Sequence, residues 1–328
     1  MLALPALGLD IAKLKFDAAL LTESGVTHHV FPNTPQGYRA LQGWSTQLGV
    51  THVHACLEAT GTYGDGVALA LHAAGQTVSF INPARLKAFA QTTMTRTKTD
   101  KTDAVLLARF CAAFRPAPWT PPLPELRELQ ALVRRWQALQ QMRQQDVNRR
   151  TGGLVQPAVH ASIDTLLVHF DQALAQVEQA LHDHLRQHPT LQRQVTLLDS
   201  IPGIAWPSAV QLLAEIGAWS NYASARALAA QAGLTPKQRL SGSSVHGKPK
   251  LAKTGSARLR KLLYFPAIVA RTHNPVIRAF CDRLAAPGKP KMVIVGAAMR
   301  KLLHLIYGVL KSGRPFDPDY RPVSAKTT

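Results

Sequence analysis

Short apolar runs of strand length alternate with amphipathic, helix-like stretches over the first third of the chain. The strand-like runs are residues 7–21, read as a strand and its hairpin partner, 51–57 and 77–81. The stretches with helical spacing are residues 36–48, 66–74 and 104–114. Period-two and period-3.6 patterns that alternate in this way are typical of an α/β layer structure. We therefore predict an α/β domain over residues 1–122.

Five prolines between residues 116 and 124 then interrupt any regular element, which indicates a boundary. Beyond it, residues 125–150 form a long polar helix with one apolar stripe, and the apolar residues from Ile163 to Leu185 recur at three and four positions. We expect the two helices to pack as an antiparallel hairpin or short coiled coil over residues 123–195. Pairing within one subunit and pairing between two subunits remain equally open.

Residues 196–328 are predicted to form a third, mainly α-helical domain. Its first part, residues 197–217, reads as a helix, a Pro-Gly turn and a second helix. In a helix-hairpin-helix, backbone amides of such a turn bind a DNA phosphate without reading sequence. Such hairpins usually have a second glycine where Ala205 stands before Trp206, so packing is an alternative role for this turn.

The charge of the chain indicates a polyanionic partner. Its formal net charge is +19, and no Asp or Glu occurs between residues 216 and 281. Neutralising phosphates releases condensed counterions, so a basic segment of this kind favours nucleic acid. We predict contacts from six cations of a glycine-bearing loop and the basic helix that follows it, which are Lys248, Lys250, Lys253, Arg258, Arg260 and Lys261.

Other classes fit the sequence less well. No run of about 18 apolar residues is evident, and the first nine residues lack the charged start of a secretory signal, so we expect a soluble, cytoplasmic protein. The three cysteines are far apart in the sequence, and the histidines lack ligand partners at useful spacing. Neither a disulfide framework nor a zinc site is predicted.

Four carboxylates occupy positions that suit a metal site. Asp10 and Glu58 each end a buried strand, while Asp100 and Asp103, three residues apart, share one face at the start of a helix. Oxygen ligands of this kind suit Mg²⁺, and two ions about 4 Å apart can activate one oxygen and stabilise another in a phosphodiester displacement. Taken singly, each acid could instead be a turn or cap residue.

The run Ser241-Gly-Ser-Ser244 lies among lysines and arginines in the same basic loop. A hydroxyl in that setting could attack a phosphodiester if a base or metal helps to remove its proton. Local composition alone favours an ordinary loop.

Seven short motifs together carry a resemblance over nearly the whole chain. They are Gly8–Lys13, Glu58–Tyr63, Asn82-Pro83, Lys98–Ala104, Ile201–Ile204, Ala232–Pro236 and Ser241–Val245. In this order they resemble the bacterial insertion-sequence transposases of the IS110 family, which have an N-terminal RuvC-like DEDD domain and a C-terminal serine domain. That family also includes site-specific DNA invertases.

The resemblance implies an RNase H-like first domain in which Asp10, Glu58, Asp100 and Asp103 bind Mg²⁺, with Ser241 as the nucleophile that becomes linked to DNA. It also implies a structured bridge RNA that pairs with donor and target DNA, and a homo-oligomer, up to a tetramer, in which one subunit's acids meet another subunit's serine. The alternatives are a RuvC-like junction-resolving nuclease, in which the acids activate water, and a non-catalytic nucleic-acid-binding protein.

Overall fold

The computed structural model of the protein describes residues 4–59, 61–92, 99–153, 156–241 and 245–319, and for residues 238–241 and 245–250 it describes the backbone alone. The chain divides into two compact units, which meet at the bond between Pro121 and Pro122. This bond lies inside the proline-rich segment that interrupts the sequence pattern. A further division of the second unit at residue 195 stays a prediction.

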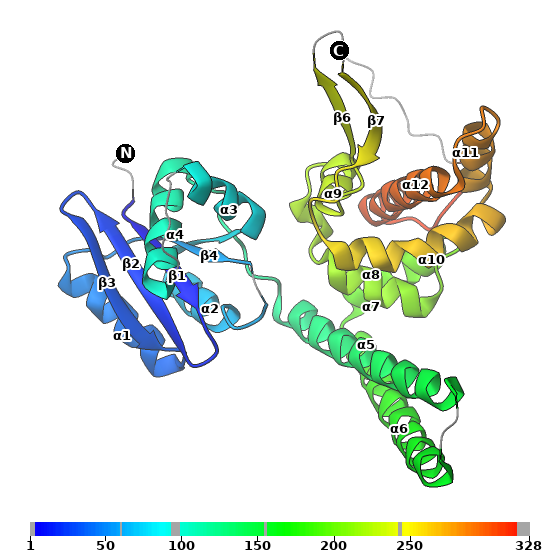
Figure 1. Ribbon diagram of the computed structural model, residues 1–328, viewed down its shortest axis with the longest axis horizontal. Coiled ribbons are helices and arrows are strands. Elements are labelled where there is room, and N and C mark those ends of the chain that lie inside the picture. The colour runs from blue at the N-terminus through cyan, green and yellow to red at the C-terminus, as the bar shows by residue number, and fades with distance from the viewer. Residues whose placement is uncertain (1–3, 60, 93–98, 154–155, 242–244, 320–328) are drawn as a thin grey trace. The chain divides into compact units, whose positions relative to one another are not determined.

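The first unit is a five-stranded mixed sheet with helices (Figure 1). Its strands are β1 (Ala6–Ile11), β2 (Lys15–Thr22), β3 (Gly25–Pro32), β4 (His54–Glu58) and β5 (Thr77–Ile81). Its helices are α1 (Pro35–Gln47), α2 (Asp65–Ala73), α3 (Pro83–Thr92) and α4 (Asp100–Phe114). The strand order is β3-β2-β1-β4-β5, in which β1 to β3 are antiparallel and β1, β4 and β5 are parallel. The predicted α/β fold class is confirmed.

The sequence pattern missed β3. Seven of its eight residues are at least partly exposed and only Phe31 is buried, so the strand lacks the apolar alternation by which a half-buried strand is recognised. It pairs along β2 as the edge of the sheet.

The two faces of β1 pack against different helices. Leu7 and Leu9 belong to the core cluster that also contains apolar residues of α1 and α2, whereas Gly8 lies against α4. A Cβ atom at Gly8 would lie 2.0 Å from the carbonyl oxygen of Ala104 and 2.3 Å from the amide nitrogen of Ala108. Only glycine permits this backbone approach. The position of α4 over β1 is therefore set by main-chain contact.

The second unit is mainly helical. Its first elements are α5 (Pro124–Thr151), α6 (Pro157–Gln187), α7 (Pro189–Asp199), α8 (Trp206–Ile216), the 3₁₀ turn η1 (Trp219–Asn221) and α9 (Ala225–Gln231). The strands β6 (Pro236–Ser241) and β7 (Val245–Leu251) follow, and then α10 (Ala257–His273), α11 (Pro275–Ala285) and α12 (Lys291–Ser312). One apolar cluster joins side chains of α5 to α12. A mainly helical second part is confirmed.

Helices α5 and α6 pack against each other within one chain (Figure 1). Leu129 and Leu181 are fully buried, and the guanidinium of Arg143 donates to the carboxylate of Asp171 across the pair at 2.6 Å. Other apolar side chains of α6, such as Leu166, remain exposed. The predicted helical hairpin therefore exists within the subunit.

The sequence predicts a loop before the basic helix, and this prediction is wrong for the backbone. Residues 236–241 and 245–251 pair as an antiparallel two-stranded ribbon, with Ser241 opposite Val245 (Figure 1). Proline and glycine at Pro236, Gly247 and Pro249 gave no strand signal, but an isolated ribbon tolerates them because only one edge of each strand is paired.

The Pro-Gly turn between α7 and α8 has a packing role. Gly203 has φ +103°, and a Cβ there would lie 2.7 Å from Cα of Ala270 in α10. The side chain of Asn274 donates to the carbonyl of Pro202 at 3.4 Å, and the ring of Trp206 stacks on His182 at 4.1 Å. Residues 205 and 206 depart from the helix-hairpin-helix pattern, and the turn before them packs against other parts of the protein.

Helix α12 is, among the described residues, the one helix long and apolar enough to cross a membrane. The most apolar window of α12 is 61% buried inside the protein, as in the core helix of a folded unit. Its Leu302, Leu303 and Ile306 are fully buried in the apolar cluster of the second unit.

Candidate active site

Asp10 and Glu58 lie side by side at the ends of neighbouring parallel strands. Leu9 of β1 is paired with Leu57 of β4, so the next residue of each strand, Asp10 and Glu58, follows at the same edge of the sheet. Both side chains are partly exposed. The sheet register therefore brings together two of the four predicted acids from positions 48 residues apart.

Helix α4 contributes the other two acids from its first turn. Thr99 is the N-cap: its hydroxyl accepts from the amide of Thr102, while the Thr102 hydroxyl accepts from the amide of Thr99. Because this capping box already satisfies the helix end, Asp100 and Asp103 are not needed as caps. They are nevertheless favourable beside the positive end of the helix dipole.

The four acids are close enough to act on one another electrostatically. The pKa of Asp10 is raised to about 6, first by partial burial and then by the charges of Asp103, Asp100, Asp17 and Glu58. Like charges gathered from two strands and a helix are costly unless a cation lies between them. The structure thus brings together all four acids that the sequence singled out.

A fifth acid, Asp17, was missed by sequence reasoning. It lies directly opposite Asp10 in the β1–β2 pair, and its side chain is 6% exposed. Nε2 of His28 lies 2.8 Å from one carboxylate oxygen of Asp17, and Nζ of Lys15 lies 3.4 Å from the other. The sequence did contain a signal for this acid, because Asp17 is the single charged residue in the apolar run of residues 16–21.

Lys15 connects this fifth acid to the predicted set. Its ammonium lies 3.2 Å from Oδ2 of Asp100, and this hydrogen bond, together with the charge of Asp17, raises the pKa of Lys15. The site therefore contains an internal cation beside its carboxylates.

The donor set fits a divalent cation. Carboxylate oxygens are hard ligands, and their mutual repulsion is relieved when a doubly charged ion enters. The chemistry of this donor set is the observation that supports the fit. The raised pKa of Asp10 agrees with it in part, because the neighbouring carboxylates add to the larger effect of burial.

The basic residues of the second unit have several environments. Ser241 is the last residue of β6; its side chain, those of Lys248 and Lys250, and residues Ser243 and Ser244 lie outside what the structure describes. Arg258 and Lys261 are exposed on α10, as is Lys253 before it. Arg260 instead donates to the carbonyl of Ala232 at 3.0 Å, so part of its guanidinium holds α10 to the end of α9.

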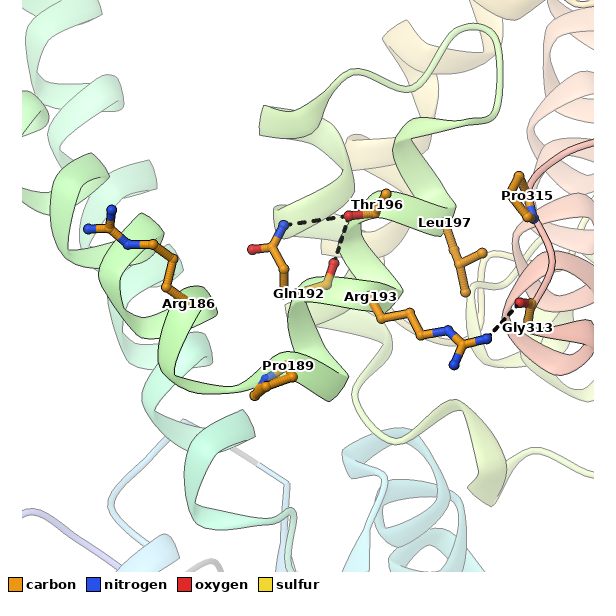
Figure 2. Close-up of a pocket in the computed structure, with 8 residues that line it drawn as sticks. All are labelled: Arg186, Pro189, Gln192, Arg193, Thr196, Leu197, Gly313 and Pro315. Carbon is orange, nitrogen blue, oxygen red and sulfur yellow. Dashed lines mark hydrogen bonds between the residues drawn. The ribbon is translucent and has the colours of Figure 1, made fainter.

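A separate pocket of about 610 Å³ lies between α6, α7 and the end of α12 (Figure 2). Its lining consists of Arg186, Pro189, Gln192, Arg193, Thr196, Leu197, Gly313 and Pro315. Arg193 donates to the carbonyl of Gly313 at 3.2 Å, and Gln192 donates to the hydroxyl of Thr196 at 3.5 Å (Figure 2). This lining has no carboxylate, so the pocket is not the acidic site.

Comparisons with known proteins agree with this geometry. A family model described as a transposase, the DEDD domain of the IS110 type, matches residues 7–157, and a second, described as the IS116/IS110/IS902 transposase family, matches residues 195–282. A pilin gene-inverting protein of Moraxella bovis is 34% identical over 314 residues, which cover 95% of this chain and 97% of that protein. The same protein of Moraxella lacunata is equally similar.

Two further similarities are more distant. An uncharacterized protein of insertion element IS110 from Streptomyces coelicolor is 28% identical over 36% of this chain and 29% of its own length. The structure of T. thermophilus RuvC in complex with a Holliday junction substrate covers 36% of this chain and all of that chain, at 11% identity and a TM-score of 0.27. The two family models and the full-length relatives show that this chain belongs to the IS110 family of transposases and is a DNA recombinase.

Proposed function

We propose that this recombinase cuts and rejoins DNA by transesterification, with Ser241 as the nucleophile and Mg²⁺ as the divalent ion, and that a bridge RNA selects the sites. The observation that supports it most strongly is the sheet register that puts Asp10 beside Glu58, near enough to the two acids of α4 for their charges to act on Asp10, because a metal-dependent phosphodiester site requires such a cluster. Asp10, Glu58, Asp100 and Asp103 would hold the ion. When bound, Mg²⁺ would stabilise the charge that develops on the leaving 3′-oxygen.

The protein's own step is a balanced exchange of esters. The Ser241 hydroxyl attacks the phosphorus, its proton leaves to water, a serine–phosphate bond forms and the bond to the 3′-oxygen breaks. A 3′-hydroxyl of another strand then attacks the serine ester and restores Ser241. The number of phosphoester bonds is unchanged throughout, so rejoining needs no ATP.

The basic stretch supports the nucleic-acid partners. Residues 216–281 contain eleven Lys and Arg residues and no acid. This favours a DNA or RNA backbone, which binds through its charge, over an acidic protein, which would also need a surface of matching shape. We propose that Lys248, Lys250, Lys253, Arg258, Arg260 and Lys261 contribute to this contact. Arg260 would do so with the N–H groups of its guanidinium that do not bind the carbonyl of Ala232.

The bridge RNA, the homo-oligomer and a cytoplasmic location rest on the family resemblance. The acids belong to the first unit and Ser241 to the second, so the chemistry must join groups from two separately folded parts of the chain. An oligomer in which one subunit's acids act with another subunit's serine would do so. Sequencing the RNA that co-purifies with the protein tests the RNA partner.

The serine mechanism is tested with labelled recombination-site DNA, Mg²⁺ and the cognate RNA on a denaturing gel, with and without protease. Wild type should give a slow, protease-sensitive protein–DNA species. Ser241→Ala should bind nucleic acid normally yet give none, whereas Ser243→Ala and Ser244→Ala are matched controls that retain the species. Asp10→Ala should cut no DNA.

Two results contradict the proposal. If wild type cuts DNA without a protease-sensitive species, or if Ser241→Ala recombines as well as wild type, the hydroxyl of Ser241 is not the nucleophile. Cleavage that still requires Asp10 would then identify a junction-resolving nuclease in which the acids activate water.

A further inference from the structure

A second cluster of metal-ligating side chains lies in the first unit, away from the carboxylates. His54 and Cys56 are two residues apart on β4 and therefore face the same side of the sheet. Cys111 comes from α4, which covers that side. One ligand atom of each side chain lies within 4.8 Å of the other two. Sequence spacing gave no sign of this, because Cys111 is 55 residues from Cys56.

The three side chains are shielded from solvent. Cys56 and Cys111 are 0% exposed and His54 is 5% exposed. The thiol of Cys111 donates to the backbone carbonyl of His54 at 3.2 Å. The cluster is thus enclosed between the sheet and α4. Unlike an exposed surface thiol, neither cysteine can meet ions from solvent by chance.

A hydrogen-bonded chain orients the imidazole. Nε2 of His54 lies 2.8 Å from the hydroxyl oxygen of Ser79 on β5. That hydroxyl lies 2.9 Å from the carbonyl oxygen of Ala117 and 3.1 Å from that of Pro116. Carbonyls only accept, so the Ser79 hydroxyl donates to them and accepts from the N–H at Nε2 of His54. This hydrogen bond uses Nε2 and leaves Nδ1 as the ring nitrogen that can bind a metal, an arrangement in which an outer hydrogen bond fixes the orientation of the ring.

We propose that His54, Cys56 and Cys111 form a structural site for a thiophilic divalent ion, Zn²⁺ in the cell. Two thiolates and a neutral imidazole balance Zn²⁺ to zero net charge, which is the condition under which an ion is tolerated in a dry interior. Binding releases the two thiol protons to solvent. A tetrahedral ion with bonds of about 2.0–2.3 Å would have its ligand atoms roughly 3.5–3.8 Å apart, so atoms that lie within 4.8 Å of one another would have to approach by at most about 1 Å. A small fourth ligand such as water would complete the tetrahedron.

Such an ion would connect two of the three elements that supply the carboxylates, β4 and α4. Strand β4 ends at Glu58, and α4 begins at Asp100, so a bond from Cys56 to Cys111 through the ion ties both elements at a distance from the chemistry. The acids select hard, oxygen-loving ions, whereas the thiolates select soft ones. The two sites should therefore be filled independently, and this proposal does not depend on the serine mechanism.

The experiment uses the full-length protein purified with a thiol-free reductant. Wild type should retain one Zn²⁺ per chain by elemental analysis, and excess Mg²⁺ should not displace it. X-ray absorption at the zinc edge should show two sulfur neighbours. Cobalt added to the metal-free protein should produce a sulfur-to-metal charge-transfer band that Cys56→Ser and Cys111→Ser lack.

Matched variants assign the ligands. Cys281 is equally buried but lies on α11 of the second unit, so Cys281→Ser should keep both sulfur neighbours. Asp103→Ala, which changes the carboxylate site, should also keep the zinc. This remains decisive if Cys56→Ser or Cys111→Ser fails to fold, since only two cysteines are left in Cys281→Ser.

Several results would overturn the proposal. They are wild-type protein without zinc or a cobalt–sulfur band, zinc with no sulfur neighbours, and zinc lost in Asp103→Ala. Peptide mapping that finds Cys56 and Cys111 joined as a disulfide in freshly purified protein would identify a redox pair in place of a metal site.

Discussion

The surroundings of the Asp10 carboxylate depend on Gly8, two positions earlier in β1, which has no side chain. Gly8 lets the backbone of α4 approach β1 so closely that a Cβ atom would be 2.0 Å from the Ala104 carbonyl. Ala104 and Ala108, both fully buried, complete this contact with the smallest side chains available. The first turn of α4, with Asp100 and Asp103, is thereby held over the end of β1.

Gly8→Ala should separate α4 from β1. Overpacking against main-chain atoms typically costs about 1–3 kcal/mol, and we expect a loss of unfolding free energy in that range together with weaker divalent-metal binding. Urea denaturation and Mg²⁺ titration measure the two effects. Gly43→Ala is the control: that glycine lies in α1 with nothing within 4 Å of its Cβ position, so the change should be neutral or slightly stabilising. Equal stability of the two variants would contradict the role of Gly8.

The raised pKa of Asp10 predicts a pH dependence of stability in metal-free protein. Its value of about 6 exceeds the ordinary 3.8, so the folded state binds the proton more tightly than the unfolded state does. The contribution of Asp10 to the free energy of unfolding is therefore most favourable below pH 3.8. It declines as the pH rises from 3.8 to about 6 and does not change further well above pH 6. Asp10→Asn should remove this component.

Urea denaturation in chelator at several pH values, with wild type and Asp10→Asn in parallel, checks the sign. The advantage of the Asn variant should grow between about pH 4 and pH 7 and then level off. Saturating Mg²⁺ should abolish the advantage because the ion neutralises the ionised cluster. An advantage that shrinks with rising pH would show that Asp10 is stabilised as its anion.

At the scale of elements, helices α5 and α6 show which apolar positions matter. Their stripes were readable from spacing alone, but the structure separates fully buried positions from exposed ones on the same helix. Leu181 is 0% exposed, whereas Leu166 is 45% exposed. The stability of the hairpin is therefore concentrated where it joins the rest of the second unit.

Leu181→Ala should destabilise the second unit by about 2–5 kcal/mol, through lost burial and the cavity left behind. Leu166→Ala, the same chemical change on the same helix, should stay within about 0.5 kcal/mol of wild type. The midpoint of urea unfolding compares them. A larger effect at Leu166 would mean that its exposed face is covered by another copy in solution.

What the sequence could and could not predict follows from the range of the interactions. Asp10 and Glu58 were found because each ends an apolar run, which is a local signal. Asp17 was not, because its place opposite Asp10 depends on the hairpin register of β1 and β2. The pairing of β6 with β7 was missed for a similar reason: strand pairing can form where proline and glycine remove the local pattern.

The whole molecule is strongly polarised in charge. Its net charge of +19 includes an acid-free stretch from residue 216 to 281, while the acids of the candidate site lie within the first 103 residues. Cations in the second unit would draw nucleic acid by counterion release, and the carboxylates of the first would repel a phosphate until a metal ion is present. Binding and cleavage are therefore expected to respond to different ions.

Replacing Lys250, Lys253 and Arg258 together with alanine should weaken binding to unrelated sequences alike. The slope of log affinity against log salt should become shallower by up to about 2.7, at roughly 0.9 per phosphate contact on B-form DNA. Fluorescence anisotropy at several salt concentrations measures this. Arg39, Lys87 and Arg109, which are exposed in the first unit, form a control triple with the same charge change. An unchanged slope in the test variant would show that its three side chains point elsewhere.

The ammonium of Lys15 lies between Asp17 and Asp100, so the metal-free protein already has one positive charge beside its carboxylates. A single ammonium cannot satisfy five acids, and an incoming double charge has most of the repulsion still to relieve. We therefore expect Lys15 to offset part of the repulsion within the metal-free carboxylate cluster and to leave the larger part for a divalent ion to relieve.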